Sequence, residues 1–386
     1  MDALEGAGGS IPVPIAVPDG KLRLLHLLLE INETSTPWNE HCLPLRRERD
    51  IRVCSYFRSR TTVPPDIDTY EGDGTLRGFL RALDRALADG RTDVIHAHAP
   101  HLAPLLAWGC WRRGISLRGT VFTVHTSFPN VRLRNRPLLL FAFACFERIV
   151  FCSRSSLQSF PRRYRWLTGR RVRTVPNGVD IDRVDRVLAG GAPSRSDGSF
   201  TIVSVGRIIP VKNPLGLLES FRRVPGEGAR MLLVGEGAQR ELVRRRAEDL
   251  GLDDRVKLTG LVPRGRVYEI LSGADLFVSA SRCEGMPIAV LEAMACRCPV
   301  LLSDIPPHRE IAEGMDFIPL VPPGDVEGFA REIERFRSRS SAERAAQGEK
   351  CRSLVEERFS LRKMHAAYPE VYTEIIAARG GSAAEE

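Results

Sequence analysis

The sequence predicts an α/β protein with two domains, each built around a parallel sheet. It has 386 residues, 43% hydrophobic and 27% charged, which is typical of globular chains. At roughly 100 to 200 residues per domain, this length favours two domains. Short β-branched or leucine-rich runs alternate with amphipathic segments in both halves, as βαβ units require. Positions 190–199, rich in Gly, Ser and Pro, separate the two alternations.

The first half, 21–175, is expected to form one domain behind a flexible tail at 1–20. That tail contains acidic residues, Gly and Pro, without Lys or Arg ahead of an apolar core, so it does not resemble a secretory signal. Strands are expected at 22–31, 51–57, 93–98, 120–125, 148–152 and 172–175. Helices are expected at 76–88, 102–113, 137–146 and 155–163.

The second half begins after a break at Pro176, Asn177 and Gly178, and we expect a linker at 176–199. A second domain is expected at 200–355, then a helix and tail at 356–386. Its strands are expected at 200–205, 230–234, 256–258, 275–279 and 299–302, with helices at 213–223, 239–249, 266–272 and 287–296. Two such halves form a cleft where the carboxyl ends of their sheets face each other, and open α/β sheets bind ligands there.

Composition excludes several classes of protein. The longest apolar stretch, 137–146, has ten residues, whereas a membrane-spanning helix needs about 20. The nine cysteines are an odd number without CxxC pairs, and Cys296 and Cys298 are too close for normal zinc-ligand spacing. The sequence therefore predicts a reduced, cytoplasmic protein with no metal site.

Two cations occupy the loop after the first strand of the second half. Arg207 and Lys212 follow Gly206 there, and lysine is scarce, with five in the whole chain. Arg offers a planar fork and Lys a compact charge, so the pair suits a diphosphate and can neutralise charge on a phosphate leaving group. The alternative is a solvated loop with surface cations.

A second motif spans 281–295. Glu284 lies in a loop after a strand, Gly285 allows a ligand close to the backbone, and Pro287 suits a first helical position. The free amides of the helix start can hold a phosphate. Glu292 is the single polar side chain of the apolar helix, so its carboxylate needs partners. The vicinal hydroxyls of a ribose would supply them, and a cap on a neighbouring loop is the alternative.

These motifs together resemble the retaining nucleotide-sugar glycosyltransferases of family 4. The resemblance rests on 206–212, Val-Gly-Glu-Gly at 234–237, the pair Glu284 and Glu292, 176–180, and Phe359-Ser360 to Tyr372. It implies a GT-B architecture, in which two Rossmann-like domains face a central cleft and the final helix crosses back to the first domain. It also implies metal-independent transfer from a nucleoside diphosphate sugar, with a UDP- or GDP-sugar as co-substrate and no cofactor.

The resemblance also assigns roles. Arg207 and Lys212 would bind the pyrophosphate, Glu292 the ribose, and Glu284 a hydroxyl of the donor sugar. His125 ends a strand and matches the active-site histidine, which would contact the donor sugar near the reacting carbon; a structural histidine is the alternative. His96 and His98 lie on the preceding strand, and either a structural or a catalytic role is open for them. The other expected donor-binding positions are Gly206, Val262, Gly285, Met286, Pro287 and Ile288.

The loop after the first strand departs from the family. Members often have a glycine-rich loop there, whereas 30–39 is polar in this chain. Asn32, Glu33, Thr34 and Trp38 are therefore candidates for recognising a hydroxylated acceptor, and a helix-capping loop is the alternative.

The predicted function is transfer of a hexose-type unit to an acceptor hydroxyl with retention of configuration. Leaving-group stabilisation would drive it, by front-face attack without an enzymic nucleophile. The acceptor would be a small molecule, a saccharide or a lipid-linked molecule. The alternatives are a non-catalytic sugar-nucleotide-binding partner subunit and a sugar-nucleotide epimerase on the same architecture.

The net charge of +8 is concentrated in one segment. Positions 121–175 hold eleven arginines against Glu147, giving +10, so the remaining residues sum to −2. Arginines beside Tyr164, Trp166 and the apolar 138–143 suit peripheral contact with an anionic membrane at its inner face. The alternative is an apolar stretch packed on the sheet with solvated arginines. Nucleic acid is not an expected partner, because the sequence contains no recognised nucleic-acid module.

Overall fold

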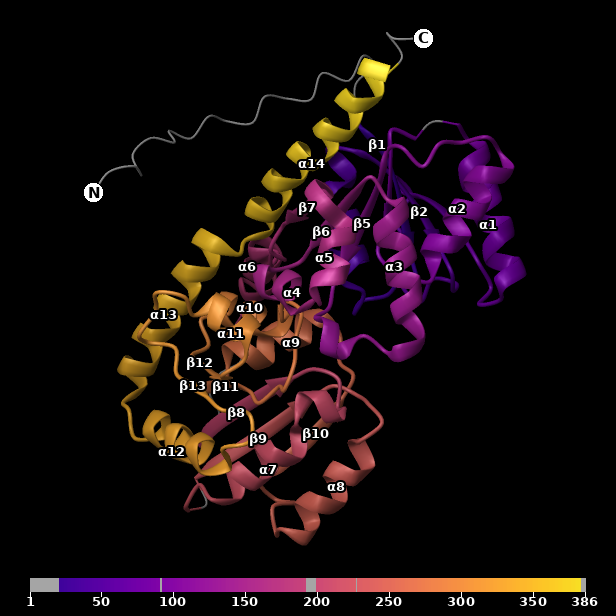
Figure 1. Cartoon of the computed structure of the whole chain (residues 1–386). Helices are drawn as coiled ribbons and strands as arrows, with labels where there is room; N and C mark the ends of the chain where they lie inside the picture. The colour runs from indigo at the N-terminus through magenta and orange to yellow at the C-terminus, as the bar shows by residue number, and fades with distance from the viewer. Residues whose placement is uncertain (1–20, 91, 192–198, 227, 383–386) are drawn as a thin grey trace.

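The computed structural model describes residues 21–90, 92–191, 199–226 and 228–382, and these form two α/β domains (Figure 1). The first holds a seven-stranded sheet in the order β3-β2-β1-β4-β5-β6-β7, and the second a six-stranded sheet in the order β10-β9-β8-β11-β12-β13. Every pairing between neighbouring strands is parallel. The predicted fold class is therefore confirmed. The expected tail at 1–20, positions 192–198 of the expected linker and 383–386 lie outside the described residues.

The first domain alternates strands and helices, except that β2 and β3 follow one another without a helix between them. Its strands are β1 (Arg23–Leu28), β2 (Asp50–Ser55), β3 (Asp68–Glu71), β4 (Val94–Ala97), β5 (Thr120–Val124), β6 (Arg148–Phe151) and β7 (Val172–Thr174). Its helices are α1 (Leu76–Ala88), α2 (Leu102–Arg112), α3 (Arg136–Cys145), α4 (Arg154–Ser159) and α5 (Arg162–Thr168), and a π-helical turn, Pro37–Cys42, follows β1. Helix α6 (Ile181–Leu188) follows the sheet, within the segment expected as a linker, and packs against α9 (Arg264–Ser272) of the second domain.

The second domain repeats this alternation and ends in helices. Its strands are β8 (Phe200–Val205), β9 (Ala229–Val234), β10 (Val256–Gly260), β11 (Leu276–Ser279), β12 (Val300–Ser303) and β13 (Leu320–Val321). Its helices are α7 (Pro214–Arg222), α8 (Arg240–Asp249), α9 (Arg264–Ser272), α10 (Ile288–Ala295), α11 (Pro306–Ile311), α12 (Val326–Arg337) and α13 (Ser341–Arg358), followed by α14 (Leu361–Ser382).

Two edge strands, β3 and β13, were not expected from the sequence. β3 has the sequence DTYE without a fully buried residue, and β13 has two residues. Each pairs along one side only, so neither needs the continuous apolar run that marks a central strand. Their hydrophobic signal is accordingly too weak to detect.

The final helix packs on the first domain. Met364, Tyr368 and Tyr372 of α14 belong to one buried cluster with Leu24 of β1 and Val121 of β5. Helices α1, α2 and α3 cover the opposite face of the same sheet. Figure 1 shows α14 running from the second domain along the first, which confirms the expected crossover. Among the described residues, no helix is both long and apolar enough to cross a membrane.

In both sheets the strand order reverses beside the first strand. β1 lies between β2 and β4, and β8 lies between β9 and β11. The crossovers leave on opposite sides of each such point, so the loops at the carboxyl ends separate and leave a crevice. The loops that follow β8 and β11 are those with the predicted motifs.

Candidate active site

The loop after β8 places Lys212 by a tight turn. Residues Pro210–Lys212 form one 3₁₀ turn, and Asn213 then adopts a left-handed conformation with φ of 54°. Asn tolerates that conformation better than most residues. The Asn213 Nδ2 donates to the carbonyl of Pro323 at 2.9 Å, which fixes the turn. Lys212 Nζ lies 2.5 Å from Glu284 Oε1, so the two predicted motifs meet.

The loop containing Glu284 is held by the first domain. The Ser127 hydroxyl donates to the Glu284 carbonyl, and the Ser153 hydroxyl donates to the Gly285 carbonyl at 2.9 Å. A Cβ on Gly285 would lie 2.6 Å from the His125 carbonyl oxygen. Gly is therefore required at position 285 for the close contact between this loop and the His125 backbone.

A pocket lies at the switch point between β8 and β11. The predicted residues that line it are Gly206, Arg207, Lys212, Glu284 and Pro287. The Arg207 side chain is exposed, and Lys212 is partly covered by its contact with Glu284. Of the other donor-binding candidates, Met286 is buried, while Val262 and Ile288 pack at the edge of the same core. The structure thus gathers cations, a carboxylate and a helix start around one crevice.

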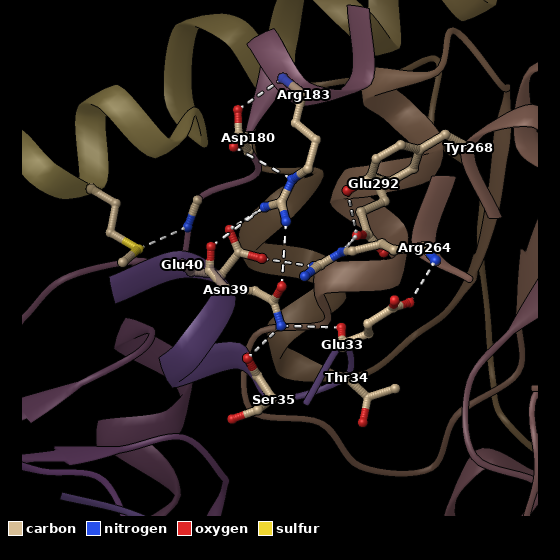
Figure 2. Close-up of polar contacts among 12 residues, drawn as sticks. Glu33, Thr34, Ser35, Asn39, Glu40, Asp180, Arg183, Arg264, Tyr268 and Glu292 are labelled. Carbon is tan, nitrogen blue, oxygen red and sulfur yellow. Dashed lines mark hydrogen bonds and ion pairs between the residues drawn. The ribbon is translucent and has the colours of Figure 1, made fainter. Parts of the chain in front are cut away.

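Glu292 is buried on α10 and its carboxylate is bound by protein groups. Its Oε1 accepts from Arg264 Nε at 2.8 Å and from the Tyr268 hydroxyl at 3.2 Å. The Arg264 guanidinium also reaches Glu40 of the first domain, with 2.7 Å between Nη2 and Oε1 (Figure 2). Sequence reasoning missed Arg264, Tyr268 and Glu40. The available signal was that Arg264 lies two positions after Val262, an expected donor-binding residue.

The polar loop after β1 is internally braced. Asn32 Oδ1 accepts from the Thr34 backbone amide at 2.9 Å, which closes a turn; Thr34 is exposed and Asn32 is half-buried. The Glu33 carboxylate accepts from the backbone amide of Arg264 at 3.2 Å. Trp38 is 1% exposed and packs in the core, so its ring does not face the cleft. This loop therefore contacts the donor side through Glu33 and Glu40.

A chain of histidines runs inward from His125. His125 Nε2 lies 3.0 Å from His98 Nδ1, and His98 Nε2 lies 3.0 Å from His26 Nδ1. His96 is held separately, by the Tyr372 hydroxyl at 3.0 Å and the Thr123 hydroxyl at 2.7 Å. His96 thus supports the crossover of α14, while His98 orients His125.

Burial keeps these imidazoles neutral. It lowers the pKa of His26 to about 3 and that of His125 to about 4, and it lowers the pKa of His41, His96 and His98 well below 6.5. The charged form is disfavoured because the interior solvates it poorly. A neutral His125 can donate or accept one hydrogen bond but supplies no charge.

Two overlapping trios in this cluster have the ligand types of a metal site. They are His26, His96 and His98, and His41, His98 and His125, with the ligand atoms in each trio within 4.8 Å of one another. In the structure the nitrogens of His26, His98 and His125 pair with each other as hydrogen-bond partners.

Comparison with known proteins agrees with this architecture. The profile of the family described as "Glycosyltransferase Family 4" matches residues 43–183, and that of "Glycosyl transferases group 1" matches 192–353. A relative from Escherichia coli, named UDP-Gal:alpha-D-GlcNAc-diphosphoundecaprenol alpha-1,3-galactosyltransferase, is 24% identical over 77% of this chain and 79% of its own.

Solved structures share the fold. HepE from Anabaena, crystallised with UDP, superposes with a TM-score of 0.72 at 17% identity, covering 92% of this chain and all of its own. Sucrose-phosphate synthase from Thermosynechococcus elongatus superposes with a TM-score of 0.74 at 18% identity over the same shares. The two family profiles, the paired parallel-sheet domains and the crossover of α14 together identify this chain as a family 4-like glycosyltransferase with the GT-B fold.

Proposed function

We propose that the protein transfers a hexose from a nucleoside diphosphate sugar to an acceptor hydroxyl, with retention of configuration and without a metal ion. The observation that supports this most is the contact between Lys212 and Glu284 in the pocket at the switch point, with Arg207 on the same loop. The donor would be a UDP- or GDP-sugar. HepE was crystallised with UDP and with UDP-glucose, and the name of the Escherichia coli relative includes UDP-Gal.

The chemistry follows from charge development on the leaving group. When the bond from the sugar to the diphosphate breaks, negative charge grows on the phosphate oxygens. Arg207 and Lys212 would neutralise it, and the amides that precede α10 would add hydrogen bonds. A cation that stands ready before reaction needs no reorganisation, and Glu284 holds Lys212 in this way. The leaving phosphate itself would take the proton of the attacking hydroxyl.

His125 and Glu284 would act on the donor sugar. Glu284 would accept from a sugar hydroxyl, and His125 would form a hydrogen bond near the reacting carbon. Because burial lowers the pKa of His125 to about 4, this hydrogen bond would come from a neutral ring at pH 7. The hydrogen bond between His98 Nδ1 and His125 Nε2 would fix which nitrogen of His125 is protonated.

We further propose a lipid-linked acceptor reached at the inner face of an anionic membrane. Trp111 on α2 is 77% exposed and Trp166 on α5 is 83% exposed, and α3, which contacts both helices, leaves Phe141 37% exposed. Exposed aromatics among arginines suit a membrane surface. The acceptor named for the Escherichia coli relative is a diphosphoundecaprenol-linked sugar, which agrees with such a partner.

Incubation with a panel of UDP-, GDP- and ADP-sugars tests the central proposal. We expect one donor to be hydrolysed slowly without metal. When the sugar of an α-configured donor is transferred, NMR should show an α-linked product. An epimerised donor with no released diphosphate would show the epimerase alternative instead. If none of the donors were turned over, either in EDTA or with added Mg²⁺, the proposal would be contradicted.

A further inference from the structure

Arg264 of the second domain joins the two domains through Glu40 of the first domain, and the same guanidinium holds Glu292 (Figure 2). We propose that Glu40 and Arg264 are positioning residues that couple closure of the two domains to the orientation of Glu292. The donor half of this inference rests on the proposed function, because it takes Glu292 as a donor-binding carboxylate.

The contacts come from one residue and reach both domains. Arg264 Nη2 lies 2.7 Å from Glu40 Oε1, and Arg264 Nε lies 2.8 Å from Glu292 Oε1. The Arg264 backbone amide donates to Glu33 Oε2 at 3.2 Å. Glu33 belongs to the loop after β1 and Glu40 to the π-helical turn that follows it, whereas Arg264 begins α9 and Glu292 lies on α10. The guanidinium fork is therefore shared between carboxylates of opposite domains.

The burial of Glu40 makes its ion pair with Arg264 depend on closure of the two domains. Glu40 is 1% exposed, and burial raises its pKa against the opposing effect of Arg264 and Arg183. Its nearest cation is Arg264, because Arg183 Nη2 lies 3.5 Å away. A buried carboxylate is costly without a cation, so separation of the domains would have to hydrate it. The ion pair therefore stabilises the closed arrangement specifically.

The contacts of Glu292 with protein groups leave part of its carboxylate able to bind the donor. Arg264 and Tyr268 both reach Oε1, and within the described part of the chain no contact to Oε2 is recorded. Nη1 of Arg264 is buried and also has no partner among the described residues. Glu292 therefore keeps one carboxylate oxygen, and Arg264 one N–H group, without a protein partner among the described residues while the bridge is intact. This arrangement favours a positioning role over a blocking one.

The test compares Glu40→Gln with Glu48→Gln. The two changes remove the same charge from neighbouring parts of the first domain, and Glu48 is exposed and outside the bridge. We expect Glu40→Gln to increase the radius of gyration by small-angle X-ray scattering without ligand. We also expect it to raise the donor KM about tenfold, as loss of a charged buried hydrogen bond does, while kcat changes less than threefold. Glu48→Gln should match the wild type in both measurements.

A second variant, Arg264→Lys, keeps the charge but lacks the planar fork, so it should give an intermediate donor KM. Circular dichroism confirms that each variant is folded. A Glu40→Gln protein with wild-type scattering and donor KM would overturn the inference, as would a fall in kcat at constant KM. Scattering reports closure independently of turnover. If the wild type turned over no sugar nucleotide, the proposed function and the donor half would both fail, and an unchanged radius of gyration would overturn the closure half separately.

Discussion

Lowering the pH should destabilise this protein well above the pH range in which carboxylates titrate. Burial lowers the pKa of His26 to about 3, and it lowers those of His125 and His308 to about 4. In the unfolded chain each has a pKa near 6.5. Between these values the unfolded state binds protons that the folded state does not, so stability is complete above pH 6.5 and is lost as the pH falls.

The magnitude follows from linkage. From pH 7.5 to pH 5.5, one such histidine costs about 1.4 kcal/mol of unfolding free energy, so these three cost about 4 kcal/mol. His41 and His98 act in the same direction, because burial lowers their pKa as well. The total unfolding free energy of a domain is roughly 5 to 15 kcal/mol, so this loss is a large share of it.

Urea denaturation followed by tryptophan fluorescence at pH 7.5, 6.5 and 5.5, at constant ionic strength, measures this loss. His308→Gln removes one titrating group and should reduce the difference between pH 7.5 and pH 5.5 by about 1.4 kcal/mol. His308 lies in the second domain, away from the cluster, so its loss leaves the other histidines in place. Equal unfolding free energies at pH 7.5 and 5.5 would refute the reasoning, because they would mean that the buried histidines accept protons without unfolding.

Three further predictions concern the proposed activity and the membrane. Lys212→Ala and Arg207→Ala should each lower kcat by about 10², because each removes a stabiliser of the leaving group, and near-wild-type turnover at saturating donor would exclude that role. Glu292→Gln should weaken binding of the free nucleoside diphosphate in calorimetry, whereas Glu284→Gln should leave it nearly unchanged; equal losses would contradict their assignment to different parts of the donor. The protein should co-sediment with vesicles containing anionic lipid at low salt and less at high salt, and Trp111→Ser should reduce this; no sedimentation at low salt would leave the basic face as a means of attracting the anionic donor.

Local patterns were sufficient for the central strands and for the donor-side motifs. Each buried strand is a short apolar run bounded by turn residues, so it can be recognised within a few positions. Arg207, Lys212 and Glu284 could be selected because each follows such a run, and parallel strands bring their carboxyl ends to one edge. The contact between Lys212 and Glu284 follows from that topology. The edge strands β3 and β13 lack this signal because they are paired along one side only.

The sequence by itself thus determined two parallel-sheet domains and the residues that gather at the β8 and β11 edge. Only the tertiary structure decided the partners of Glu292 and His125. Arg264 and Glu40 are 224 positions apart, and His26 and His98 are 72 apart. Contacts at such separations depend on how the domains close and how the strands are ordered, and no local periodicity encodes either. A buried carboxylate or imidazole must find a partner, but burial does not specify which distant residue supplies it.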